Sequence, residues 1–234
     1  MEILKGKYVL VAGATGGIGK QVVKLLHQSG AVVYAAGRNE TILQQIGSEW
    51  QLPADRLLVL DVTKEHQVAQ AIQHVPQVDI LVNAAGIGII KSMDTLTLDD
   101  FNKSLQVNLV GTFNLVKAVL PQMKERKKGL IINIPGVLGK VPMAGAAAYS
   151  ASKYGIVGMM QSIREELKRT DIRITNLFLG GVDSPFWDTI DLRVQRDKMI
   201  VAEEAAKAIW FLCQQPNSGV VSEMVLQPFN HQAI

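Results

Sequence analysis

The chain has 234 residues, of which 48% are hydrophobic, and a formal net charge of +3. This length and composition are typical of a globular protein, and we expect one domain over residues 1–234. The small net charge excludes the strong positive field of a nucleic-acid-binding protein.

The cysteine, the histidines and the hydropathy pattern indicate which classes of protein the chain does not belong to. The one cysteine, Cys213, cannot form an internal disulfide, and the four histidines, His27, His66, His74 and His231, lack the spacing of metal ligands. No apolar run approaches the roughly 18 residues that a membrane-spanning helix needs. Glycines follow the N-terminus too closely for a signal-peptide core. We therefore expect a cytoplasmic protein with no structural metal and no nucleic-acid or membrane partner.

Short apolar runs alternate with longer amphipathic stretches along the chain. Because the runs are apolar on both faces and a helical stretch follows each one, they predict a parallel sheet covered on both sides. We expect an α/β fold, a doubly wound Rossmann domain of about seven strands. The predicted strands are YVLVAG (8–13), AVVYAAG (31–37), RLLVLDV (56–62), DILVNAAG (79–86), GLIINI (129–134), IRITNLFLGG (172–181) and SEMVLQP (222–228).

Helices are expected to connect these strands. The first ends near Ser29, a long one covers 105–126, and later ones cover 147–168 and 203–212. The segment SPFWDTIDLRVQRDKMI (184–200) is the only candidate insertion. We expect it to form a lid over a pocket.

A glycine-rich loop joins the first predicted strand to the first helix. It places Gly13, Gly17 and Gly19 where a tight turn and the N–H groups of a helix N-terminus can approach a pyrophosphate. A triphosphate-binding loop needs a glycine five positions before the Gly-Lys pair and Ser or Thr after it, but this chain has Ala14 and Gln21 there. A dinucleotide therefore suits the loop better than a triphosphate.

A tyrosine and a lysine lie one helical turn apart in AYSASKYG. The side chains of Tyr149 and Lys153 share one helix face, with about 6 Å between their Cβ atoms. Because an ammonium at that distance favours the phenolate, we expect the pKa of Tyr149 to fall below its usual value of about 10. On spacing alone, a buried tyrosine beside a solvated lysine remains an alternative.

Three motifs together resemble the short-chain dehydrogenase/reductase family. They are the loop AGATGGIG (12–19), the strand end NAAG (83–86) and YSASK (149–153), which come in the family's order and spacing over nearly the whole chain. Two departures are Ala12 in place of the family's threonine and LGGVDS (179–184) where P-G-x-V-x-T is usual. The resemblance implies an oxidoreductase that interconverts an alcohol and a carbonyl on a small-molecule substrate by hydride transfer with a nicotinamide cofactor.

The resemblance also implies the parts of a cofactor site. Asp61 and Val62 resemble the pair that contacts adenine, although Asp61 could instead cap a helix. Val182 and Ser184 would lie over the nicotinamide carboxamide. The implied cofactor-binding residues are Gly13, Thr15, Gly17, Ile18, Gly19, Arg38, Asp61, Val62, Asn83, Ala84, Gly86, Tyr149, Lys153, Val182 and Ser184.

The end of the second predicted strand indicates the cofactor's phosphate. NAD enzymes of this design keep an acidic residue there for the adenosine ribose, whereas this chain has Gly37 and Arg38. A guanidinium beside a small residue suits a 2′-phosphate through charge-assisted hydrogen bonds. We therefore expect NADP(H), with an Arg38 that only solvates a loop as the alternative.

The family resemblance gives roles to three catalytic residues. Tyr149 would exchange a proton with the substrate oxygen, and Lys153 would also hold the nicotinamide ribose. Asn108 resembles the asparagine whose backbone binds a water that connects the lysine to solvent. A plain helix kink is the alternative for Asn108, because asparagine has poor helix propensity.

The fourth catalytic position departs from the family. Counting thirteen residues back from Tyr149 gives Gly136 where a serine is usual, and Pro135 and Gly136 occupy the central positions of a predicted type II turn. A missing donor typically costs about 10² to 10³ in rate. We therefore expect a weakened enzyme, or alternatively a cofactor-binding regulatory or interaction protein with little turnover. Phe186 and Trp187 offer an apolar or aromatic surface to a substrate.

Two helices suggest self-association. In the resembling family the corresponding helices pack across two-fold axes, so we expect a homodimer or homotetramer. The helical stretches 111–124 and 147–168 carry small and apolar residues on several faces, among them Ala118, Ala151, Gly155, Gly158, Met159 and Met160.

Overall fold

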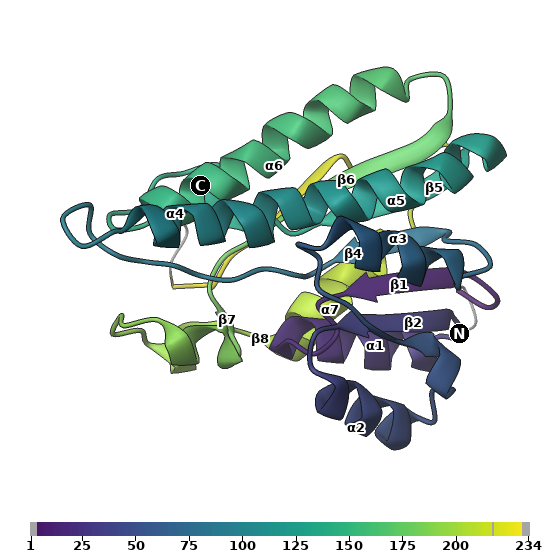
Figure 1. Ribbon diagram of the computed structural model, residues 1–234, viewed down its shortest axis with the longest axis horizontal. Helices are drawn as coiled ribbons and strands as arrows, with labels where there is room; N and C mark the ends of the chain where they lie inside the picture. The colour runs from purple at the N-terminus through teal and green to yellow at the C-terminus, as the bar shows by residue number, and fades with distance from the viewer. Residues whose placement is uncertain (1–3, 217, 231–234) are drawn as a thin grey trace.

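A seven-stranded parallel sheet forms the centre of the computed structural model, which describes residues 4–216 and 218–230 (Figure 1). The strand order is β3-β2-β1-β4-β5-β6-β9, and each neighbouring pair is parallel. This confirms the predicted doubly wound sheet. The strands are β1 (Tyr8–Ala12), β2 (Val32–Gly37), β3 (Leu57–Val59), β4 (Ile80–Asn83), β5 (Lys128–Asn133), β6 (Asp171–Leu179) and β9 (Glu223–Leu226).

Helices cover both faces of the sheet (Figure 1). One face carries α1 (Gly17–Gln28), α2 (Glu40–Trp50) and α7 (Ala202–Leu212), whose buried residues share a core with Val9 and Val11 of β1. On the other face, Leu10 of β1 shares a second core with α3, α5 and α6. The helices on that side are α3 (Glu65–Gln73), α4 (Leu98–Ser104), α5 (Gly111–Arg126) and α6 (Ala147–Glu166). Burial on both faces explains why the strands are apolar without alternation.

The long helix predicted over 105–126 is not uniform. Residues Leu105–Val110 form a π-helical stretch between α4 and α5. A π-bulge inserts an extra residue into the turn, and such bulges are frequent at functional sites. Asn108 lies within this stretch and is fully buried.

The third strand is shorter than predicted. The sequence indicated 56–62, but β3 ends at Val59 and the chain turns at Asp61. The Asp61 carboxylate accepts hydrogen bonds from the backbone N–H and the hydroxyl of Thr63, each at 2.9 Å. This local turn competes with strand pairing and ends the strand.

A two-stranded parallel pair lies apart from the main sheet. It joins β7 (Val182–Asp183) to β8 (Ile200–Val201), so it pins the two ends of the predicted lid together. The segment between them contains two single 3₁₀ turns, Pro185–Thr189 and Arg196–Lys198. In Figure 1 this segment projects beside the sheet, beyond β7 and β8.

No helix in the described part of the chain is both long enough and apolar enough to cross a membrane.

Candidate active site

The glycine-rich loop lies at the carboxyl end of β1, between β2 and β4. Ala14 N–H donates to the carbonyl of Ala36 in β2 at 3.0 Å. Gly13 has φ +80°, and a Cβ on it would lie 2.6 Å from the carbonyl carbon of Ala84. The loop therefore requires glycine at position 13, both for its backbone conformation and for its contact with β4.

Helix α1 begins without side chains that satisfy its N-terminus. Its N-cap residue is Gly16, with no side-chain cap hydrogen bond, and its first turn holds no acidic residue. The Ile18 side chain packs against the core, and a Cβ on Gly19 would lie 2.0 Å from the Gly13 carbonyl oxygen. Backbone N–H groups are thus available at the positive end of a 12-residue helix, which suits a pyrophosphate.

The end of β2 combines a close contact with an exposed cation. A Cβ on Gly37 would lie 2.8 Å from Cγ2 of Thr15, so glycine allows the glycine-rich loop to pack on this strand. The next residue, Arg38, is exposed and forms no ion pair within residues 4–216 and 218–230. Asn39 then caps α2 by accepting from Ile42 N–H at 3.0 Å. Arg38 therefore lies beside a helix N-terminus, where a phosphate is favoured.

Asp61 keeps half of its hydrogen-bonding capacity. Its Oδ1 is used by Thr63, whereas α3 is capped at Lys64. The alternative in which Asp61 caps this helix is therefore wrong. Oδ2 has no hydrogen bond to the described residues. Val62, the next residue, is buried against Gly111 at the start of α5.

The NAAG segment connects the sheet to α5, to the π-helical stretch and to α6. Asn83 is buried, and its Nδ2 donates to Thr112 Oγ1 at 2.8 Å, so its side chain is directed to α5. Ala84 continues the ladder with its N–H bonded to the Ala12 carbonyl. A Cβ on Gly86 would lie 3.2 Å from Asn108 Oδ1 and 3.4 Å from Lys153 Nζ. Gly86 therefore lets the strand end pass close to both polar groups.

Tyr149 and Lys153 lie together, as their spacing predicts. Lys153 Nζ is 5.4 Å from the centre of the Tyr149 ring and donates to the Ile134 carbonyl at 3.1 Å. The predicted fall in the tyrosine pKa is wrong. Desolvation of the phenolate raises the pKa of Tyr149 above its usual value. Burial also lowers the pKa of Lys153 to about 8.

Asn108 clamps the loop that follows β4. Its side-chain oxygen accepts from Ile87 N–H at 2.9 Å, and its Nδ2 donates to the Ile87 carbonyl at 3.1 Å. Its own carbonyl accepts from Thr112 Oγ1 at 2.5 Å. The helix is distorted at Asn108, as the alternative expected, and the side chain holds the segment beside Lys153. The water-binding role of its backbone stays a prediction.

Gly136 has a backbone conformation that favours glycine, but the predicted type II turn is wrong. Its φ is +70°, as that turn requires, whereas its ψ is 171° instead of near 0°. The chain therefore leaves β5 extended and enters a 3₁₀ turn at Val137–Gly139. A Cβ on Gly136 would lie 3.4 Å from the Leu179 carbonyl oxygen, so space alone does not exclude a side chain.

The predicted lid packs against Tyr149. The Phe186 ring centre is 6.0 Å from that of Tyr149, at 57° between planes, and Trp187 packs edge-on against Phe186 at 5.3 Å. Trp187 Nε1 also donates to the carbonyl of Val182, which is buried. Ser184 is buried, and its Cβ would lie 2.7 Å from a Cβ on Gly17. The lid therefore contacts both the glycine-rich loop and the tyrosine.

Two further polar residues belong to this site and were missed from the sequence. Thr112 links Asn83 to the Asn108 carbonyl, and Ser152 Oγ accepts from Asn108 Nδ2 at 2.9 Å. Ser152 is fully buried. A hydroxyl one turn after Asn108, and another beside Lys153, are the signals that could have identified them.

The described residues contain no cluster of three or more His, Cys, Asp or Glu that could hold a metal ion. His231 lies outside the described residues. Cys213 is buried, and burial raises its pKa to about 12.

Comparisons with known proteins agree with this geometry. A family model described as short chain dehydrogenase matches residues 7–194. An uncharacterized oxidoreductase of Staphylococcus epidermidis is 32% identical over 232 residues, covering 97% of this chain and all of that protein. Serine dehydrogenase from Escherichia coli has a TM-score of 0.85 at 28% identity, covering 96% of this chain and 99% of that one. A closed form of serine dehydrogenase complexed with NADP+ has a TM-score of 0.87 at 27% identity, covering 96% of both chains. With a match over most of its length and the motif residues gathered at one sheet edge, the chain belongs to the short-chain dehydrogenase family of oxidoreductases.

Proposed function

We propose that the protein is an NADP(H)-dependent oxidoreductase that interconverts an alcohol and a carbonyl, with a rate weakened by Gly136. The observation that carries this proposal is the meeting of Tyr149, Lys153 and Asn108 at the carboxyl edge of the sheet, beside a helix N-terminus suited to a pyrophosphate. The weakening follows because Gly136 provides no side-chain donor for the reacting oxygen.

The residues present fit a nicotinamide dinucleotide. The uncapped N-terminus of α1 suits the pyrophosphate, and Asp61 Oδ2 is available as an acceptor for the adenine amino group. Ser184 and Val182 border the glycine-rich loop and suit the carboxamide end. The exposed Arg38 suits a 2′-phosphate, which supports NADP(H) over NAD(H). When bound, this cofactor supplies the hydride for carbonyl reduction.

Tyr149 is the proton donor to the carbonyl oxygen in this proposal. Because burial raises its pKa, the phenol keeps its proton at neutral pH, as a general acid requires. Lys153, with a pKa of about 8, is mostly charged at pH 7 and stabilises the phenolate that forms when the proton leaves. Asn108 holds the Ile87 backbone and so fixes the loop that borders Lys153.

A second function is favoured by one observation. A chain that keeps the cofactor cradle but lacks a hydroxyl at position 136 could serve as a cofactor-binding regulatory or interaction protein with little turnover. The fully intact Tyr149, Lys153 and Asn108 favour the enzyme.

Oxidation of NADPH, measured by absorbance with a panel of aldehydes, ketones and quinones, tests the proposal. We expect slow turnover with at least one carbonyl and its loss in Tyr149→Phe. Binding of NADPH without turnover on any carbonyl would favour the second function. Turnover that survives Tyr149→Phe would contradict the assigned mechanism.

We also propose that the protein is a homodimer or homotetramer in the cytoplasm. On the outer side of α6, Ala151, Tyr154 and Gly158 are exposed at helical spacing, and Phe113 is exposed on neighbouring α5. These four residues could pack against a second copy. By contrast, Met160 is buried in the protomer and Gly155 packs against Leu109, so they contribute less than their sequence suggested.

A further inference from the structure

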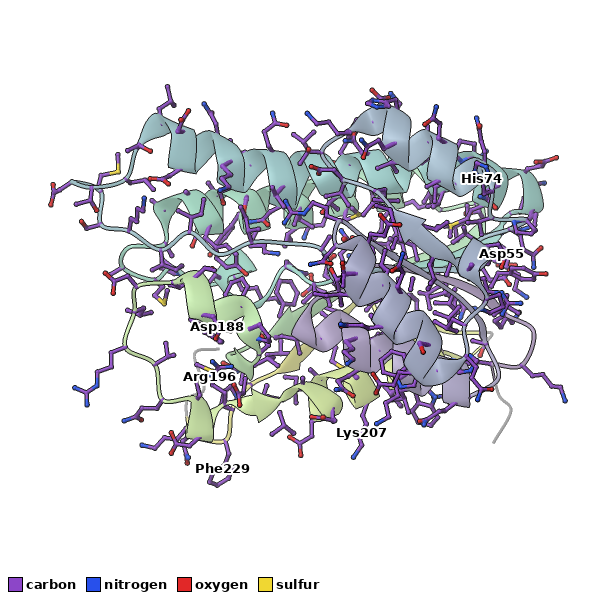
Figure 2. All side chains as sticks on the ribbon, turned by 60° about the horizontal axis from the view of Figure 1, so that its bottom comes forward. Asp55, His74, Asp188, Arg196, Lys207 and Phe229 are labelled. Atoms are coloured by element: carbon purple, nitrogen blue, oxygen red, sulfur yellow. The ribbon has the colours of Figure 1, made fainter. Side chains whose placement is uncertain are left out.

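One arginine joins three parts of the lid. Arg196 Nε donates to Asp183 Oδ1 at 2.5 Å, and its Nη1 donates to Asp188 Oδ1 at 2.7 Å. Its Nη2 donates to the Ser184 carbonyl at 3.0 Å. Figure 2 labels Arg196 and Asp188, which lie close together in the lid segment. The two carboxylates also raise the pKa of Arg196, as charge-assisted bonds do.

These bonds span the part of the lid that carries the aromatic residues. Asp183 lies at the end of β7 and Asp188 lies in the 3₁₀ turn Pro185–Thr189, so Phe186 falls between the two bonded carboxylates. The β7–β8 pair already pins the ends of the lid. Arg196 therefore adds an internal brace to a segment that is short and largely exposed.

The Phe186 ring packs against the backbone at Gly88, in the segment that follows β4. A Cβ on Gly88 would lie 2.4 Å from Phe186 Cζ and 2.6 Å from Ile190 Cδ1. The lid thus packs against a bare backbone, next to the ring of Tyr149. The contact leaves no room for even a methyl group at position 88, so glycine there allows Phe186 to approach the backbone.

We propose that Arg196 is a positioning residue that holds Phe186 between Gly88 and the ring of Tyr149, and so fixes the apolar wall of the substrate pocket. This inference rests on the proposed reductase function. A guanidinium suits the role because its planar fork bonds two carboxylates and a carbonyl at once, which an ammonium cannot do with the same geometry. The substrate group that meets this wall is apolar or aromatic.

Arg196→Gln is the test variant, and Arg193→Gln is its matched control. Arg193 lies in the same lid, is exposed and forms no ion pair within the described residues. With a carbonyl substrate, Arg196→Gln should raise KM about tenfold, because it loses two partly exposed ion pairs that are each worth up to about fivefold, while kcat stays the same. The KM of Arg196→Lys should lie between that of Arg196→Gln and that of the unmodified protein. The control should behave as the unmodified protein.

A second measurement does not depend on turnover. Chymotrypsin cleaves after aromatic residues and leucine, and the lid offers Phe186, Trp187 and Leu192. Cleavage within the lid should be faster in Arg196→Gln than in the control, and added salt should accelerate it in the unmodified protein but not in Arg196→Gln. If the protein reduces no carbonyl, the cleavage rates still test whether Arg196 holds the lid in place. Equal cleavage rates, or an unchanged KM in an active enzyme, would overturn the proposal.

Discussion

Replacing Gly136 with serine tests two opposing effects at one position. The backbone there has φ +70° and ψ 171°, a region that only glycine adopts easily. A side chain in such a conformation costs about 1–3 kcal/mol of stability. Since a Cβ meets only the Leu179 carbonyl oxygen, at 3.4 Å, we attribute the cost to backbone strain rather than to a clash.

The expected gain is chemical. A hydroxyl that donates to the reacting oxygen is worth about 10² to 10³ in rate. Gly136→Ala carries the same strain without the hydroxyl, so the ratio of kcat/KM between Gly136→Ser and Gly136→Ala isolates the donor. We expect that ratio to be about 10 to 10³, the lower end applying if the strained backbone aims the hydroxyl poorly.

Thermal unfolding by circular dichroism measures the strain separately. Both variants should unfold about 2–12 °C below the unmodified protein, from about 2–4 °C per kcal/mol for a chain of this size. Equal kcat/KM in the two variants would refute the idea of a lost donor. A serine variant slower than the alanine variant would show instead that Gly136 makes room for substrate. Unchanged unfolding temperatures would refute the argument from backbone conformation.

Three further predictions concern the cofactor, the pH profile and assembly. Arg38→Asp should reverse a preference for NADPH over NADH, read from fluorescence titrations; equal binding of both by the unmodified protein would remove this role. Carbonyl reduction should be fastest below pH 8 and slow above it, because Lys153 loses its charge as the pH rises through its pKa of about 8; a decline that starts only near pH 10 would contradict this. Light scattering should give a mass above 25.5 kDa, and Gly158→Arg, at a position with open space around it, should lower that mass; a monomeric unmodified protein would refute the interface.

The sheet and its helices could be predicted because the signals that define them are local. The central strands are apolar runs that a parallel sheet buries on both faces, and amphipathic stretches separate the runs along the chain. The ends of the elements were less predictable. The run 79–86 reads as one strand, but β4 ends at Asn83, because Gly86 leaves the sheet to pass beside Asn108 and Lys153.

The site residues could be named from spacing, but their chemistry could not. Spacing places Lys153 beside Tyr149, yet it does not show that Lys153 is buried and Tyr149 partly buried, and the resulting desolvation decides the direction of both pKa shifts. In the same way, Pro135-Gly136 indicates a positive φ without fixing ψ. The hydrogen bonds of Arg196 depend on how the segment 183–196 folds back on itself, and no periodic pattern of apolar residues predicts such a fold.

A row of buried asparagines crosses three neighbouring strands near their carboxyl ends and lowers the stability of the sheet. Asn83, Asn133 and Asn176 are register partners on β4, β5 and β6, and all three are buried; Asn83 and Asn133 end their strands, whereas Asn176 lies within β6. Asn83 donates to Thr112, which donates to the Asn108 carbonyl, so this end of the row supports the segment around Asn108. Asn133 Nδ2 and both side-chain polar atoms of Asn176 make no hydrogen bond to the described residues. A buried polar group left unpaired costs about 1–3 kcal/mol, and valine would avoid that cost. The unpaired amide groups of Asn133 and Asn176 therefore lower the stability of the sheet near the carboxyl ends of its strands, where the site residues lie.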